Sequence, residues 1–86
     1  MKLLSNAVSG GKRIDAAAYL GLMYLTGQGV TKNLVSAHMW ANIAAAYAID
    51  LGRSVRDEAA KFMTPVEIER AQALARECKE KRYRDC

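Results

Sequence analysis

Apolar side chains recur three and four residues apart along most of the chain, and this spacing is typical of one face of an α-helix. The first long run of such positions predicts a helix over residues 14–26. A second helix is predicted over residues 33–49, with Asn33 as its N-cap. The glycines within residues 27–30 predict a tight turn with positive φ between these two helices.

The second half of the chain predicts two further helices. Asp50-Leu51-Gly52 is expected to close the second helix, and a shorter helix is predicted over residues 54–62. The clearest local signal is the segment 64–67, in which threonine caps, proline takes the first helical position and glutamate completes a capping box. The last helix is predicted to run to about Arg82. Its expected buried stripe consists of Ile68, Ala71, Ala75 and Cys78.

Composition supports a single all-helical domain. The chain has 86 residues, of which 51% are hydrophobic, so it is too apolar to be disordered over most of its length. Much of that fraction is alanine, and only one proline occurs, which favours closely packed helices over a sheet. Residues 2–9 also have helical composition, and Gly10-Gly11 is expected to end that fragment.

The formal charge of +4 is a mild excess of basic residues. Because acidic residues are interleaved with the basic ones, we interpret the charged positions as a solvated helix face, and nucleic acid is not the expected partner. The strongest argument for nucleic acid is the basic segment 79–84, where Tyr83 would stack on bases. A helix end whose cations complement the helix dipole explains this segment equally well.

The two cysteines, Cys78 and Cys86, are predicted not to be bonded to each other. Eight residues along one helix would separate them by roughly 12 Å, which is too far for a disulfide. Cys78 is therefore expected to be a small core residue and Cys86 an exposed terminal thiol. The start of the chain lacks the pattern of a signal peptide, and the longest apolar stretch, residues 16–25, is about half a membrane span. We expect a cytoplasmic protein without a membrane segment.

No enzymatic chemistry is predicted. The chain has no nucleophile paired with a base and no phosphate-binding glycine motif, since Gly27-Gln28-Gly29 follows a helix rather than a strand. His38 is the only histidine and has no paired cysteines nearby, so neither a metal site nor a cofactor is expected. His38 is interpreted as a surface residue of the second helix.

Residues 16–45 contain a set of regularly placed positions: Leu20-Gly21, Tyr24, Gly27-x-Gly29-Val30, Ala37, Trp40 and Ala44-Ala45. With these residues the segment resembles the Sel1-like repeat, a helix–turn–helix unit related in size to the tetratricopeptide repeat. Asn33 and Ala41 depart from the family's preferred aspartate and aromatic residue. The segments Arg56-Asp57, Met63-Thr64-Pro65, Ala71-Gln72 and Leu74-Ala75 are similar to a tail that follows the last repeat in bacterial members. The anchor residues of the resemblance and of the tail's capping box are Leu20, Gly21, Tyr24, Gly27, Gly29, Val30, Ala37, Trp40, Ala44, Thr64, Pro65 and Glu67.

The resemblance implies one full repeat over residues 14–49, a partial repeat over residues 1–11 and a C-terminal helical cap over residues 53–86. Gly21 lies inside the first predicted helix, where glycine costs about 1 kcal/mol relative to alanine. We expect it to allow a close approach of the second helix at Ala37 and Ala41.

In this family the first helix of each repeat lines the binding surface, which implies an adaptor, regulator or inhibitor of another protein. The helix 14–26 carries a second apolar stripe made of Tyr19, Leu22, Met23 and Thr26. Either the N-terminal fragment and the final helices cover this stripe, or it forms a groove for a partner peptide or a homodimer contact. In the second case Gln28, His38 and Asn42 are expected to offer polar contacts at its edge.

Overall fold

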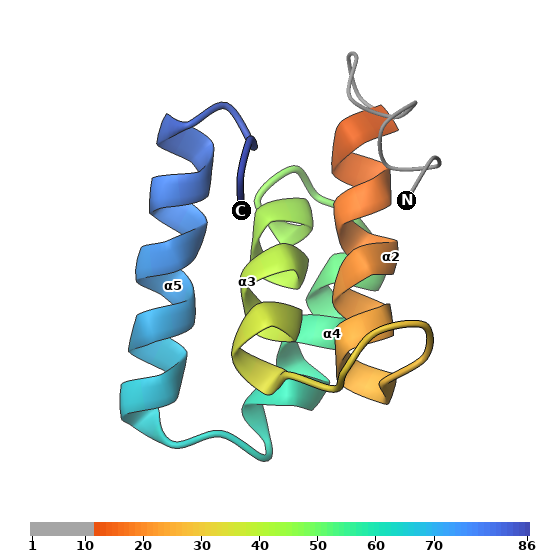
Figure 1. Cartoon of the computed structure of the whole chain (residues 1–86), viewed down its shortest axis with the longest axis vertical. Coiled ribbons are helices and arrows are strands. Elements are labelled where there is room, and N and C mark those ends of the chain that lie inside the picture. The colour runs from red at the N-terminus through yellow and green to blue at the C-terminus, as the bar shows by residue number, and fades with distance from the viewer. Residues whose placement is uncertain (1–11) are drawn as a thin grey trace.

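The computed structural model describes residues 12–86, and these residues form four α-helices (Figure 1). They are α2 (Lys12–Thr26), α3 (Leu34–Ala45), α4 (Asp50–Ala60) and α5 (Pro65–Glu80). The predicted all-helical class is confirmed. The partial repeat expected over residues 1–11 lies outside the described residues.

Helix α3 is the centre of the domain. Helices α2 and α4 pack against it, and also against each other, while α5 packs against a different side of α3 (Figure 1). Because three helices surround it, α3 is buried on most of its circumference. Its buried residues are Ala37, His38, Met39, Ala41, Ile43, Ala44 and Ala45. Trp40 is only partly buried and packs against the core cluster that Met39 and Ile43 form with residues of α2 and α5.

Two glycines allow the helices to approach at backbone distance. A Cβ atom on Gly21 would lie 3.1 Å from both the carbonyl oxygen of Ala37 and the amide nitrogen of Ala41, as expected from the sequence. Gly52 in α4 makes an even closer approach, since its Cβ would lie 2.7 Å from the Cβ of Ala44 and 2.8 Å from the carbonyl oxygen of Ala41. From the sequence, Gly52 is expected at the end of a helix. Instead it lies inside α4, where it allows that helix to reach α3.

The local signals at helix starts are confirmed. Asn33 caps α3, and its side chain accepts a hydrogen bond from the amide of Ser36 at 3.0 Å. At the start of α5, Thr64 and Glu67 form the predicted capping box with Pro65 at the first helical position. The turn after α2 has the expected positive φ values, 76° at Gly27 and 82° at Gly29.

The end of α3 differs from the prediction. The helix ends at Ala45 rather than Ile49 because the chain makes a Schellman turn, in which the amide of Ile49 donates to the carbonyl of Ala44 and that of Ala48 donates to Ala45. Ala48 has the left-handed φ of 63° that this turn requires. As a result, Asp50 begins α4 instead of closing α3, and α4 starts four residues earlier than expected.

The end of α5 has the same turn. The amide of Tyr83 donates to the carbonyl of Cys78 at 2.7 Å, and the amide of Arg82 donates to Lys79 at 3.0 Å. Arg82 occupies the left-handed position with a φ of 55°. The helix therefore ends at Glu80, slightly before the expected Arg82, and the chain folds back toward α3 (Figure 1).

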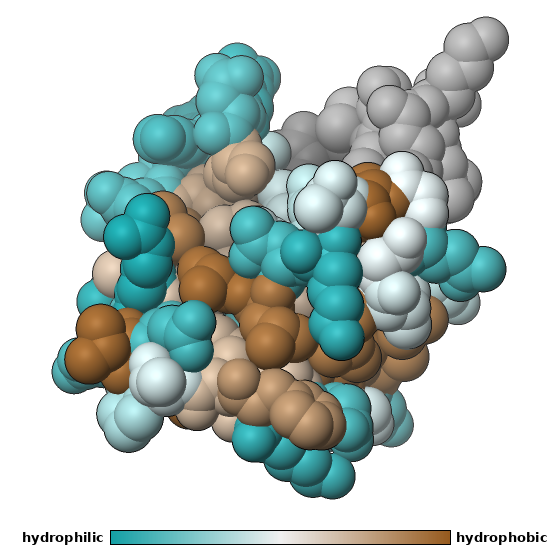
Figure 2. Space-filling view, turned by 60° about the horizontal axis from the view of Figure 1, so that its bottom comes forward, coloured by the Kyte–Doolittle hydropathy of each residue, from teal (hydrophilic) through white to brown (hydrophobic). Residues whose placement is uncertain are grey.

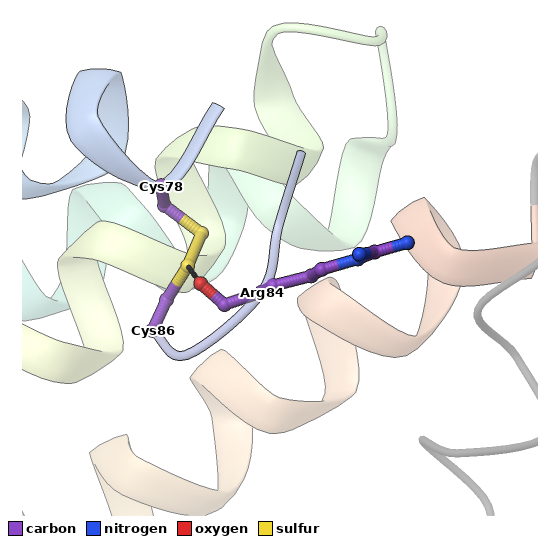
Figure 3. The surroundings of a disulfide bond; sticks show 3 residues. All are labelled: Cys78, Arg84 and Cys86. Carbon is purple, nitrogen blue, oxygen red and sulfur yellow. Dashed lines mark hydrogen bonds between the residues drawn. A yellow bond between two sulfur atoms is a disulfide. The ribbon is translucent and has the colours of Figure 1, made fainter. Parts of the chain in front are cut away.

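The prediction that the cysteines are not bonded is wrong. Cys78 and Cys86 form a disulfide with a Cα–Cα distance of 5.6 Å, and the carbonyl oxygen of Arg84 lies 3.3 Å from the Cys86 sulfur (Figure 3). The expected separation assumed one continuous helix between them. Because the chain reverses after Glu80, Cys86 returns to the level of Cys78. Cys78 is buried, as expected, and Cys86 is not a free thiol.

Candidate interaction surfaces

The outer face of α2, formed by Tyr19, Leu22, Met23 and Thr26, is partly open to solvent. Tyr19 is 58% exposed, Thr26 is also exposed, and Leu22 and Met23 are partly buried. The prediction that the final helices cover this stripe is wrong for α5, which packs on α3 and makes no extensive contact with α2. Cover by the N-terminal fragment concerns residues outside the described part of the chain.

The three polar residues expected at the edge of that stripe do not come together. Gln28 is exposed in the turn after α2. Asn42 is partly buried on α3, where it faces α5 rather than the outer face of α2. His38 is 3% exposed, so its assignment to the surface is wrong. The polar contacts anticipated around the α2 stripe therefore reduce to Gln28.

His38 is buried because α3 is enclosed by other helices, and this enclosure could not be read from its own periodicity. Burial lowers the pKa of His38 below its usual 6.5, the positive charge of nearby Arg56 lowers it further, and Asp57 acts in the opposite direction. Among residues 12–86, no hydrogen-bond partner lies at its Nδ1. The imidazole is thus a neutral, structural group that faces charges of α4 rather than a contact for a partner.

A groove lies between α3 and α5, and we name it the α3–α5 groove. Its volume is about 330 Å³, and it is open on one side. It is lined by Asn42, Ile43, Ala46, Tyr47, Ala75, Arg76, Lys79 and Tyr83. The hydroxyls of Tyr47 and Tyr83 are hydrogen-bonded at 2.7 Å, so the turn after α3 is joined to the turn after α5 at this point.

The sequence reasoning found only Asn42 among the residues of this groove. A signal for two others was present, because Arg76 and Lys79 are three residues apart and flank the predicted buried stripe at Ala75. No comparable signal marked Tyr83. Its place depends on the left-handed turn at Arg82, and its ring is half-buried against the core instead of extending from a helix end.

A smaller pocket of about 150 Å³ lies along the same two helices. Its lining has charges of both signs, with Glu77 and Asp85 beside Lys81, and it includes both cysteines of the disulfide. Because its acidic side chains outnumber its basic one, the lining of this pocket is mildly negative and does not favour an anionic ligand.

Two apolar side chains are exposed where α4 is followed by α5: Phe62 in the turn between them and Val66 in the first turn of α5. Phe62 is 68% exposed and Val66 is 73% exposed. Figure 2 views the end of the molecule that lies at the bottom of Figure 1, and it shows hydrophobic side chains gathered near the centre with hydrophilic ones around them. Exposed apolar residues of this kind are common singly on protein surfaces, so we use Phe62 below as a reference position.

Within residues 12–86, no group of three His, Cys, Asp or Glu side chains is placed to hold a metal ion. None of the described helices is long and apolar enough to cross a membrane.

Comparison with models of known protein families, with curated proteins and with solved structures found no match to this chain. What the structure defines is therefore the class: an all-α domain of four packed helices over the described residues, with α3 at its centre.

Proposed function

We propose that this protein is a protein–protein interaction module built on a Sel1-like helical repeat. Gly21, Gly27 and Gly29 support the repeat assignment, because the first allows the close α2–α3 approach and the other two form the positive-φ turn between these helices. The remaining anchors are compatible with it: Leu20, Ala37 and Ala44 are buried, and Tyr24, Val30 and Trp40 are partly buried.

The observation that carries the proposed function is the exposure of Tyr19 on the outer face of α2. Tyrosine combines a large apolar ring with a polar hydroxyl and is enriched among residues that contribute most to binding. Met23 adds an adaptable apolar side chain on the same helix face, four residues away. A partner helix or peptide that covers this face would bury the tyrosine ring at little cost in conformational entropy.

The test compares Tyr19→Ala with Phe62→Ala, which removes an aromatic ring that is even more exposed, in the turn between α4 and α5. Each variant and the wild-type protein would be used as bait in the native host, and captured proteins would be quantified by mass spectrometry. We expect a partner of the wild-type protein to be lost with Tyr19→Ala and kept with Phe62→Ala. Adding Met23→Glu to the first variant should complete the loss.

Folding of each variant is checked by circular dichroism before capture. If Tyr19→Ala with Met23→Glu keeps its melting temperature and recovers the same proteins as the wild type, the outer face of α2 is not the binding surface. A melting temperature that rises with protein concentration would instead indicate a homodimer.

The Cys78–Cys86 disulfide is an indication of the cellular compartment in which the protein is found. Disulfides form and persist in oxidising compartments and are rare in the cytosol. We therefore propose an oxidising compartment in place of the cytoplasmic location expected from the sequence. Trapping free thiols with an alkylating reagent in intact cells, followed by mass measurement, tests this proposal. Labelling of both Cys78 and Cys86 in the native host would contradict it.

A further inference from the structure

The α3–α5 groove has the size of a site for one or two side chains. Its volume of about 330 Å³ is at the lower end of the range for ligand pockets. Ile43 and Ala75 are buried and form its apolar floor, and the hydrogen-bonded tyrosine pair closes one part of it. Asn42 supplies an amide that can either donate or accept.

The charges of the groove all have one sign. Arg76 and Lys79 line it, and no aspartate or glutamate does. The ion pairs Arg53–Asp50, Arg56–Asp57 and Lys61–Glu58 involve neither Arg76 nor Lys79, and among the described residues neither of these two cations is neutralised by a salt bridge. Two cations three residues apart on one helix face form a local positive potential, which an anionic group would complement.

The shape of the groove distinguishes between two kinds of anionic partner, a nucleic-acid strand and an acidic peptide segment. A nucleic-acid strand needs a cationic track along its backbone and open aromatic faces for its bases. Here both cations belong to a single small groove, and the Tyr83 ring packs against the core with its hydroxyl on Tyr47. An acidic peptide segment matches better, because one carboxylate can reach the cations while a neighbouring apolar side chain covers Ile43 and Ala75.

We propose that the α3–α5 groove binds an acidic peptide segment of a partner protein, with a carboxylate at Arg76 and Lys79 and an adjacent apolar side chain on Ile43. This site is separate from the outer face of α2, so its test does not depend on the function proposed above. Because Arg forms paired hydrogen bonds with carboxylates, Arg76 is expected to contribute more than Lys79.

The disulfide makes this site dependent on redox state. Tyr83 is one side of the groove, and the tail that carries it is held to α5 through the Cys78–Cys86 bond. A dithiol such as dithiothreitol cleaves that bond by exchange: it gives two electrons and two protons to the two cysteine sulfurs and becomes a cyclic disulfide itself. After reduction, the tail is held by noncovalent contacts without the covalent bond, among them the packing of Tyr83 against the core and its hydrogen bond with Tyr47. We therefore expect the groove to bind its ligand more weakly.

The test uses two small probes that differ by one charge, N-acetyl-leucyl-glutamate amide and N-acetyl-leucyl-glutamine amide. Each is titrated into uniformly ¹⁵N-labelled oxidised protein and followed by the shifts of backbone amide signals. We expect the glutamate probe to shift the signals of the groove residues and to bind at least about fivefold more tightly than the glutamine probe, because a hydrogen bond to a charged group is the stronger one.

Matched variants assign the effect to the groove. Arg76→Gln with Lys79→Gln should abolish the preference for glutamate. Arg70→Gln with Lys32→Gln, which also removes two exposed cations but leaves the groove intact, should keep it. Cys86→Ser should weaken binding of the glutamate probe to the same extent as dithiothreitol weakens binding to the wild-type protein.

Two results would overturn the proposed peptide site, and a third would overturn its dependence on the disulfide. The first is equal binding of both probes, or shifts that lie away from the groove. The second is tighter binding of a hexathymidylate oligonucleotide than of the glutamate probe at the same residues, which would make the groove a nucleic-acid site. The third is unchanged affinity for the glutamate probe in Cys86→Ser, which would refute the dependence on the disulfide.

Discussion

Helix α3 is packed in two different ways by its neighbours. Toward α2 and α4 the contact is made by glycine and alanine, and the backbones approach so closely that a Cβ on Gly21 or Gly52 would meet backbone atoms of α3. Toward α5, the large side chains of Met39 and Ile43 meet small residues of α5, namely Ala75 and Cys78, and two pockets remain along this contact. The close-packed side gives the domain its shape, whereas the open side offers space for a ligand.

The two sides of α3 therefore depend on different kinds of stabilisation. On the close-packed side, stability comes from dispersion contacts between small residues, so any added atom disturbs the fit. On the open side, α5 and its tail are also held by a covalent bond and by the Tyr47–Tyr83 hydrogen bond.

Gly52→Ala is expected to have the largest effect, a loss of about 2–3 kcal/mol in the free energy of unfolding, because overpacking a rigid contact is costly. The new methyl group would lie 2.7 Å from the Cβ of Ala44. Gly21→Ala is the matched comparison. Its closest contacts are 3.1 Å, and alanine regains about 1 kcal/mol of helix propensity, so a much smaller loss is expected. Urea denaturation measures both, and equal losses would contradict the contrast between the two glycines.

On the open side, Cys86→Ser is expected to cost about 2 kcal/mol, because the unfolded chain is no longer constrained by the short disulfide loop. Thermal unfolding of oxidised protein provides the measurement. The wild-type protein in dithiothreitol serves as the control and should melt at the same temperature as the variant. A variant as stable as the oxidised wild type would show that the bond adds nothing to the fold.

Ala48→Gly is expected to stabilise the protein by about 1 kcal/mol, since a left-handed backbone conformation is unfavourable for alanine and free of cost for glycine. Ala48 has a φ of 63° in the turn that ends α3. The matched control is Ala46→Gly, where the φ of −63° gives glycine no advantage. A melting temperature lowered equally by both substitutions would contradict the assigned turn.

The smallest effect concerns His38 on the close-packed side. Its folded pKa is below the unfolded value of 6.5, so between these two values the unfolded state binds more protons. Its contribution to stability is therefore present above pH 6.5 and is lost as the pH falls through 6.5 toward the folded pKa. His38→Gln should reduce this dependence, measured by denaturation between about pH 5 and pH 8. If the free energy of unfolding changes with pH in the same way in the wild type and in His38→Gln, the histidine is not the cause of the pH dependence.

Much of the fold could be predicted because its signals are local. Asn33 and the Thr64–Glu67 box cap helices with side chains that the sequence displays, and Gly27 marks a positive φ by its type. The same turn at the ends of α3 and α5 places Ala48 and Arg82 in the left-handed position, and neither residue type indicates this. For that reason the sequence did not predict where α3 and α5 end, or that the chain after Glu80 returns toward Cys78.

The candidate sites were less predictable because they depend on which helices become neighbours. The second apolar stripe of α2 was open to two interpretations, a covered stripe or a surface for a partner. The second one requires an exposed Tyr19, and Tyr19 is exposed because α5 packs elsewhere. His38 was placed at the surface because its own helix does not reveal that α4 covers it. The α3–α5 groove combines residues from α3, α5 and two turns, and only the tertiary structure brings them together.

The glycine and alanine contacts around α3 also reverse the usual relation between hydrophobicity and mutational tolerance. In most cores, a substitution that increases apolar character is accepted more readily than one that decreases it. At Ala37, Ala41 and Ala44, which are completely buried, a change to valine adds hydrophobicity and also adds volume where none is free. A saturation library at these positions should therefore retain serine and glycine more often than leucine, while Ile43, which borders the groove, should retain large aliphatic residues.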